Sequence, residues 1–471
     1  MKPVSYTHSL ALHAIVTCLH FTVSIGRPAN DVSTPTKIPK NGNGNFKGQF
    51  WAGADIGTVP RAEAIPGRKF YDFDGTTQKD PVKTLADAGV NALRVVTDRS
   101  QCLGPTNFIN NGSERGDELD YKLDFGCIDT QAKIALRGVD QGMRVVHTIN
   151  QGFTIPKAFE SYTYAQMISE VQKEAKRQLQ PFLDAEILPD IILFENEGTD
   201  GFLFIEESTG RMRGVKANDE SDSTLDRELC GALPTGNMAS YPQYSGYLKA
   251  EIIACNEAIL AAGYSNATVR YGLHSHGQYV QWKEETVHSP KQLSQTDLKD
   301  SSGKTCTGEP AIPADILAQN VSTMLTIAGF SAYPDPMTPT DINSADAQKA
   351  TLNRLTETLT QIQGYAEAYG KYDSGPFAGQ HKLQSFGVEY ATSFSADEIL
   401  QQQTHTELMW KTVKGFENFL GMMWWEPWYC YNHWEGGKAT LCKTGTWEEN
   451  SETPTDTLKT WGKAAVSPWK D

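Results

Sequence analysis

The chain has 471 residues, of which 21% are charged and 10% aromatic, and its formal net charge is −15 at neutral pH. A chain of this length can bury a large core in one big domain or in two smaller ones. The acidic balance and the lack of a basic run argue against nucleic acids and anionic membrane surfaces as partners. The ten tryptophans suit stacking on flat sugar faces where they line a cleft, and core packing elsewhere.

The amino-terminal segment has the features of a secretory signal. One lysine precedes an apolar stretch from about Leu10 to Ile25, which fits a signal better than a membrane span. We expect cleavage near Gly26, a mobile leader over residues 27–48, and a single domain over residues 49–471. Glycosylation sequons begin at Asn111, Asn266 and Asn320. The segment and the sequons together predict a secreted, extracellular glycoprotein.

The cysteines add expectations about disulfide bonds. Eight are present, and one lies in the expected signal, which leaves seven. The odd number requires at least one thiol that is free or bonded to another molecule. Cys255 lies in a helical pattern, and we expect it to be the buried, unpaired one. The plausible bridges are Cys102–Cys127, Cys230–Cys306 and Cys430–Cys442. No Cys-x-x-Cys or His-x-x-x-His spacing indicates zinc.

Short apolar runs alternate with helical patterns along the whole domain. Eight runs are expected to be strands: 49–56, 91–96, 143–148, 191–194, 267–273, 327–332, 383–388 and 420–424. Helical patterns cover 80–88, 131–141, 164–186, 245–262, 312–325, 345–369, 396–418 and 456–463. This alternation argues for parallel βα units.

An α/β fold of the (β/α)8 TIM-barrel type is favoured over a doubly wound open sheet. The strand count reaches eight, no Gly-x-Gly-x-x-Gly turn follows the first strand, and polar or aromatic clusters follow nearly every strand. Two polar excursions, over residues 201–244 and about 284–309, are expected to be long loops at the carboxyl face.

Polar and aromatic side chains stand at the carboxyl ends of these strands, where barrel enzymes place their active sites. Two are glutamates: Glu197 follows the fourth strand, and Glu389 follows the seventh. The others are Arg94, His147, Asn196, His274, His276, Tyr333, Trp425 and Glu426. Because the fourth and seventh strands face each other across a closed barrel, the two carboxylates are predicted to meet at one mouth.

Two opposed carboxylates, with tryptophan nearby and no metal site, fit glycoside hydrolysis. One carboxyl protonates the leaving oxygen, and the other attacks the anomeric carbon or activates water; a gap of about 5 Å gives retention and a clearly wider gap inversion. Glu197, flanked by another carboxylate and by apolar strands, is the candidate acid/base. Glu389 is the candidate nucleophile, which Arg94 would keep ionised. Asn196 could bind the sugar 2-hydroxyl.

The remaining candidates have simpler alternatives. Tyr333 could hold the nucleophile by a hydrogen bond or could pack in the core, and Arg94 could be a structural ion-pair partner. The three histidines are expected to bind sugar or to be structural, because carboxylates already fill both chemical roles. Glu426 could lie on the rim. Of Trp424 and Trp425, one is expected to pack between barrel and helices, and the other to face the mouth.

Several segments resemble glycoside hydrolase family 53, the arabinogalactan endo-β-1,4-galactanases of clan A, over nearly the whole mature chain. The similar stretches are FWAGADIGTVPRAEAIPGRKFYDFDG, LADAGVNALRVV, ILFENEGTDGFLF, FSAYPDP, FGVEYATSF and MMWWEPW. The resemblance implies that Glu197 is the acid/base and Glu389 the nucleophile. It implies a retaining endo-hydrolase of β-1,4-galactan from plant cell walls.

Some stretches depart from the family pattern. The third strand leads into HTINQGFTIP, where the family has His-Tyr-Ser-Asp and then Trp-Ala-Asp-Pro-Gly, and the fifth strand ends in LHSHG instead of carrying Asp and Asn. These differences lie around the sugar subsites and leave the hydrolytic residues in place, so a different β-glycan stays open as the substrate. A barrel that binds polysaccharide without cleaving it is a third alternative, against which both glutamates and the Arg-Asn-Tyr set argue. We expect a monomer without a cofactor. Bacterial members of the family can hold a structural calcium ion, but no clustered Asp/Asn loop here requires one.

Overall fold

The computed structural model describes residues 37–41, 50–64, 69–99, 127–152, 154–162, 164–196, 203, 205–208, 241–275, 324–332, 345–392, 399–425, 427, 434–435, 438–439, 446–447 and 453–466. The expected signal and the second excursion lie outside these residues. Most of the leader, of the first excursion and of the expected helix 312–325 lie outside them too. Expectations about these segments stay predictions.

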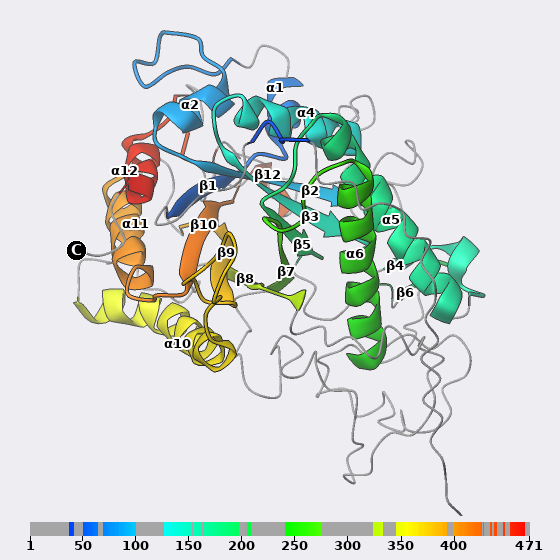
Figure 1. The fold of residues 1–471 in the computed structure, drawn as a ribbon. Coiled ribbons are helices and arrows are strands. Elements are labelled where there is room, and N and C mark those ends of the chain that lie inside the picture. Colours follow the sequence, from blue (N-terminus) through cyan, green and yellow to red (C-terminus); the bar gives the residue numbers. More distant parts are fainter. Residues whose placement is uncertain are drawn as a thin grey trace, which may run out of the picture.

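Eight parallel strands close into a barrel, as the sequence predicts (Figure 1). They are β1 Trp51–Asp55, β2 Ala92–Asp98, β3 Arg144–Asn150, β5 Ile191–Phe194, β7 Arg270–Ser275, β8 Ile327–Ala332, β9 Gln384–Tyr390 and β10 Phe419–Trp424. The order around the barrel is β1, β10, β9, β8, β7, β5, β3, β2. Barrel strands that are consecutive in the chain are therefore neighbours, and β10 closes the ring against β1. The carboxyl ends of all eight strands meet at one mouth.

Helices surround the strands, which makes the fold a (β/α)8 barrel (Figure 1). They are α1 Val59–Ala64, α2 Pro81–Asp87, α4 Ile128–Val139, α5 Tyr164–Asp184, α6 Tyr241–Ala261, α10 Ala345–Tyr369, α11 Ile399–Val413 and α12 Asp456–Val466. Shorter elements are the 3-10 helix η2 Lys157–Phe159 and two strand pairs, β4 Thr154–Ile155 with β6 Ile205–Glu206 and β11 Trp434–Glu435 with β12 Lys438–Ala439. In the described part of the chain, no helix has the length and apolar character needed to span a bilayer.

Local sequence explains where helices begin. The Asp80 carboxylate accepts hydrogen bonds from the backbone N–H groups of Val82 at 2.7 Å and Lys83 at 3.2 Å, and thereby caps α2. Pro81 is the first residue of the helix, where its missing N–H costs nothing. Such start signals lie within a few residues of each other, so the sequence alone could place this helix.

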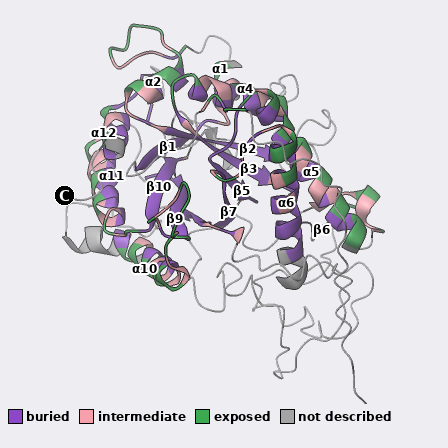
Figure 2. Cartoon of the chain, in the orientation of Figure 1, coloured by how far each residue is buried: buried purple, intermediate pink, exposed green. Residues whose placement is uncertain are grey.

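Nearly all residues of the eight strands are buried (Figure 2). Their apolar side chains form one layer inside the barrel and another between the strands and the helices. One cluster fills the barrel interior: Trp51, Ala92, Val146, Ile191, Leu193, Ile327, Phe386, Val388, Leu420 and Met423. Intervening residues such as Leu93 and Ile192 belong to two outer clusters beneath the helices. The packing is close, since a Cβ added to Gly421 would lie 2.3 Å from the carbonyl oxygen of Trp51. This filled interior is the floor of the mouth.

The observed elements depart from the predicted ones at their ends and by short elements that the sequence patterns did not indicate: α1, η2 and the pairs β4–β6 and β11–β12. The strand over residues 383–388 was predicted to end before Glu389, whereas β9 continues to Tyr390, so Glu389 lies within the strand. Cys255 is free and buried, as predicted. Each expected disulfide bridge includes at least one cysteine outside the described residues, so the bridges stay predictions.

Candidate active site

Arg94 of β2 is the centre of a polar cluster at the mouth of the barrel. Its side chain is fully buried. Nη1 donates to Asp55 Oδ2 at 2.8 Å and to Glu389 Oε1 at 2.6 Å. Nη2 donates to Asn196 Oδ1 at 2.5 Å, and Nε donates to Thr148 Oγ1 at 3.0 Å. One guanidinium therefore links the ends of β1, β3, β5 and β9, and its charge stabilises the carboxylates that it contacts.

A β-bulge turns Glu389 toward Arg94. Gly387 and Glu389 pair with adjacent residues of β8, so Val388 is an extra residue in β9. Val388 packs in the interior cluster, and regular alternation would send the next side chain outward to the helices. The extra residue instead brings Glu389 inward as well. Bulges beside active sites commonly redirect a side chain in this way.

A second irregularity places Asn196. The Leu193 side chain packs inside the barrel, so alternation would also point Glu195 inward and Asn196 outward. Glu195, however, has a φ of 60°, in the left-handed region that side chains other than glycine rarely adopt. Its carboxylate lies in the barrel wall and accepts a hydrogen bond from the Gln151 backbone N–H at 3.0 Å. The turn brings Asn196 to Arg94.

His274 joins the cluster through a serine. The Ser331 hydroxyl lies 2.9 Å from His274 Nε2 and donates to Glu389 Oε2 at 3.4 Å. All three side chains are buried. If the Ser331 hydroxyl gives its single proton to the carboxylate, Nε2 of His274 must be protonated to donate the shorter bond. Both oxygens of Glu389 therefore receive hydrogen bonds, one from a guanidinium and one from a hydroxyl.

Asp55, Thr148 and Ser331 belong to this cluster, although the sequence analysis did not select them. Asp55 accepts from the Gly57 backbone N–H at 3.1 Å besides contacting Arg94. Burial raises the pKa of Asp55; the Arg94 guanidinium opposes this effect, and Glu389 adds to it. The available signal was an acidic residue at the end of the first apolar run, the same signal that identified the glutamates.

One of the two tryptophans at the end of β10 packs between the barrel and the helices, as expected. Trp424 is buried in the outer layer, with its ring edge-on to Tyr390 at 5.3 Å and to Trp461 of α12 at 5.0 Å between centroids. Trp425 is half-buried, and its backbone N–H donates to the Tyr390 carbonyl at 2.8 Å. Regular alternation after Trp424 would put Trp425 on the side of the mouth, and this placement stays a prediction. Four further candidates lie outside the described residues: Glu197, His276, Tyr333 and Glu426.

His147 is not part of the cluster, which corrects its assignment as a substrate-binding residue. Its neighbours on β3, Val146 and Thr148, face the interior, so alternation sends His147 toward the helices. There its ring stacks on Phe182 of α5 at 4.0 Å, and Nε2 lies 2.8 Å from Thr97 Oγ1. Burial lowers the pKa of His147 to about 3. His147 therefore has a structural role in packing between the barrel and α5, which was the alternative to sugar binding.

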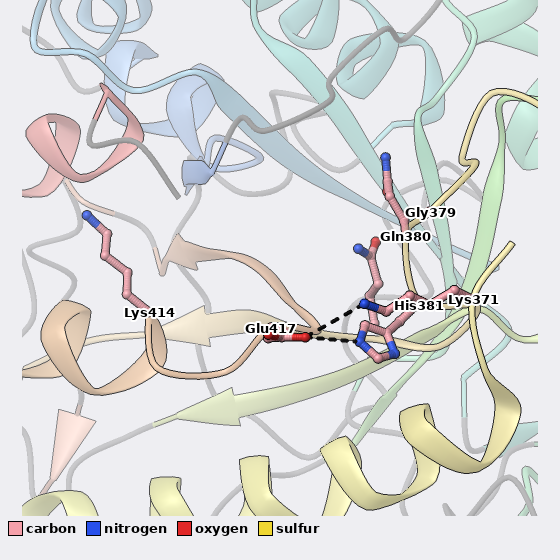
Figure 3. Close-up of a pocket in the computed structure, with 7 residues that line it drawn as sticks. Lys371, Gly379, Gln380, His381, Lys414 and Glu417 are labelled. Carbon is pink, nitrogen blue, oxygen red and sulfur yellow. Dashed lines mark ion pairs between the residues drawn. The ribbon is translucent and has the colours of Figure 1, made fainter. Parts of the chain in front are cut away.

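A cavity of about 260 Å³ lies at the opposite end of the barrel (Figure 3). Its lining comes from the segments that lead into β9 and β10: Lys371, Gly379, Gln380, His381, Gln384, Lys414 and Glu417. The Glu417 carboxylate lies 3.7 Å from Lys371 Nζ and 3.9 Å from His381 Nε2. None of the residues predicted for the active site lines it. The chemistry suggested by the strand ends therefore belongs to the Arg94 cluster.

The cluster can position a reactive carboxylate. Glu389 is held at both oxygens, and the Asn196 amide is held by the same guanidinium, so both groups are pre-oriented for a ligand at the mouth. Within the described ranges, no group of three His, Cys, Asp or Glu side chains is arranged to bind a metal ion. The arrangement suits nucleophilic or acid–base chemistry by a carboxylate.

Comparison with known proteins gives similarity at the level of structure. No protein-family model and no curated protein sequence matches the chain. A family 53 glycoside hydrolase catalytic domain from Ignisphaera aggregans superposes with a TM-score of 0.55 and 15% identity, covering 88% of this chain and 95% of that one. One of two fungal β-1,4-galactanases gives a TM-score of 0.53 and 15% identity, with 88% and 99% covered. Both are structures of the kind that the sequence motifs resemble, and at this identity the likeness shows a shared (β/α)8 barrel fold.

Proposed function

We propose that this protein is a glycoside hydrolase that acts on a β-glycan. The observation that carries the proposal is the pairing of Glu389 with the buried guanidinium of Arg94, at 2.6 Å, at the carboxyl end of the barrel. A carboxylate fixed there, beside an oriented amide, can serve as the nucleophile in displacement at an anomeric carbon, and a second carboxyl must protonate the leaving oxygen. The family 53 motifs in the sequence and the two similar structures support the same activity.

We propose a retaining mechanism in two steps. In the first, the Glu389 carboxylate attacks the anomeric carbon and forms a glycosyl ester, while Glu197 gives its proton to the departing glycosidic oxygen. In the second, Glu197 takes a proton from water, whose oxygen attacks the same carbon and releases Glu389. Arg94 keeps Glu389 charged in the free enzyme, and Asn196 is placed to bind the sugar 2-hydroxyl. Trp425 offers an aromatic face to the mouth.

The favoured substrate is β-1,4-galactan, including the arabinogalactan of plant cell walls. The resemblance of ILFENEGTDG and MMWWEPW to family 53 supports it, and so does the likeness in fold to a family 53 catalytic domain and to a fungal β-1,4-galactanase. The amino-terminal apolar segment and the sequons support action outside the cell. The stretches after the third and fifth strands differ from the family pattern, so another β-glycan is the second candidate.

The test is a panel of purified galactans, glucans and mannans, with product anomers followed by NMR from the first minutes of reaction. We expect cleavage of galactan with a β-anomer as the initial product. Glu389→Gln and Glu197→Gln should each lower turnover by about four orders of magnitude or more with the fold intact. Glu417→Gln, at the opposite end of the barrel, is the matched control and should keep full activity.

Three outcomes contradict parts of the proposal. If the protein cleaves only a glucan or a mannan, galactan is not the substrate. If the first product is an α-anomer, the mechanism is not a retaining one. Binding without any product from the whole panel favours a polysaccharide-binding barrel.

A further inference from the structure

Behind the candidate site, two buried glutamates meet at one glutamine. Glu195 follows β5, Glu251 lies on α6, and Gln151 follows β3; all three are at most 1% exposed. The Gln151 backbone N–H donates to Glu195 Oε1 at 3.0 Å, and its side-chain NH₂ donates to Glu251 Oε1 at 2.7 Å. Arg99 donates to the Gln151 amide oxygen at 2.5 Å, which fixes the direction of that NH₂. We call these residues the wall cluster.

The wall cluster favours neutral carboxyls. Oε2 of Glu195 and Oε2 of Glu251 are buried without a hydrogen-bond partner. Burial, and for Glu195 also the nearby Glu251, raises the pKa of both carboxyls, that of Glu251 to about 8. The other charged or titratable groups that act on the pair are Asp98 and Arg99 from the end of β2, Glu174 of α5 and Cys255 of α6.

The anchored side chain coincides with the left-handed turn. The Glu195 backbone N–H donates to the Ile149 carbonyl at 2.9 Å, so both its main chain and its side chain are fixed to the end of β3. A left-handed φ costs a residue with a Cβ on the order of 1 kcal/mol, and the surroundings must hold it there. The next residue is Asn196, whose amide oxygen accepts a hydrogen bond from Arg94 Nη2 at 2.5 Å.

We propose that Glu195 is a positioning residue: by anchoring its side chain to Gln151 beside Glu251, it holds the backbone turn that points Asn196 into the barrel mouth. This role rests on the proposed function for its effect on turnover, but not for its effect on structure. In this role Glu195 does not contact the substrate. Its side chain fills its buried site and accepts a hydrogen bond, and its negative charge is not needed. A neutral side chain of the same shape should therefore replace it.

The test compares Glu195→Gly with Glu195→Gln. Glycine adopts the left-handed conformation freely but removes the anchor, so we expect kcat to fall about 100-fold, as a misplacement near 1 Å can cause. In a crystal structure of this variant, Asn196 should have left Arg94 Nη2. Glutamine keeps the shape and an acceptor oxygen, and should restore both kcat and the contact.

Glu186 provides a matched control. It is also a glutamate with a left-handed φ, of 63°, but its side chain is 59% exposed. It precedes β5, at the other end of the strand from Asn196. Glu186→Gly should leave kcat and the Asn196–Arg94 contact unchanged, which separates loss of the anchor from the mere introduction of glycine.

The outcomes distinguish this inference from the proposed function. If Glu195→Gly retains both kcat and the Asn196–Arg94 contact, Glu195 is not a positioning residue, whatever the enzyme cleaves. If the unaltered protein cleaves no glycan, the proposed function fails, and the crystal structures of the two variants still decide the role of Glu195. If Glu195→Gln behaves like Glu195→Gly, a neutral anchor is insufficient, and the inference is wrong.

Discussion

Replacing Arg94 with methionine is the most informative perturbation of the candidate site. Methionine keeps an unbranched apolar chain in place of the aliphatic part of arginine, but it removes the guanidinium that contacts Asp55 and Glu389 at 2.8 and 2.6 Å. The same change removes the donors to Asn196 and Thr148. Two buried carboxyls and one amide are then left without their shared partner.

The expected loss of stability is large because the guanidinium is fully buried. Removing one partner of a buried ion pair costs about 3–5 kcal/mol, since the remaining charge stays desolvated. Burial favours the neutral form of a carboxyl, so the folded variant binds protons more tightly than the unfolded chain. Its stability therefore falls as pH rises, and the deficit relative to the unaltered protein should be larger at pH 8 than at pH 5. Turnover should fall about 100- to 1,000-fold.

The assay is urea unfolding at pH 5 and pH 8, with turnover measured on the preferred glycan. Arg137→Met is the matched control, because Arg137 also contacts two acids, Glu63 at 2.7 Å and Asp80 at 2.8 Å, but is 31% exposed. An exposed pair contributes about 0–1 kcal/mol. If Arg94→Met is no more damaging than Arg137→Met, or if its deficit does not depend on pH, the reasoning about the buried cluster is refuted.

Three further predictions concern single buried groups. Burial raises the pKa of Glu251 to about 8, so its contribution to stability is complete below the ordinary carboxyl pKa and is lost as pH rises through 8. Between pH 6 and 8, the free energy of unfolding should therefore fall by roughly 1 kcal/mol per pH unit because of this residue, and Glu251→Gln should remove that dependence in urea unfolding. An unchanged pH dependence in the variant contradicts this prediction. His147→Ala should cost about 2–4 kcal/mol of stability through lost packing, while kcat measured well below the unfolding temperature stays within a few-fold of normal; a selective loss of kcat would return His147 to the site. Asp55→Ala removes acceptors from Arg94 and Gly57 and should destabilise the fold by about 1–3 kcal/mol, and Asp55→Asn should recover most of this loss if hydrogen bonding, not charge, is its main contribution.

The sequence was sufficient to identify several members of the cluster. Arg94 and Asn196 lie in or just after apolar runs, and Glu389 follows one, so closing a barrel brings all three to the same mouth. Asp55 carried the same signal at the end of the first run and was passed over. His147 shows the limit of this argument, because β3 is buried on both faces and its sequence gives no sign of which side chains face the interior.

The number of strands, the polar strand ends and the described helices other than α1 depend on short-range patterns, so the order of residues alone was enough to predict them. The directions of the Glu389 and Asn196 side chains depend on the tertiary structure. Glu389 faces inward because β9 has one residue more than its partner β8, and Asn196 because Glu195 is anchored to Gln151, 44 residues away in the chain. A strand covered on both sides is apolar on both sides, so no period of two marks the inner face. Only pairing with neighbouring strands, which the chain acquires on folding, decides it.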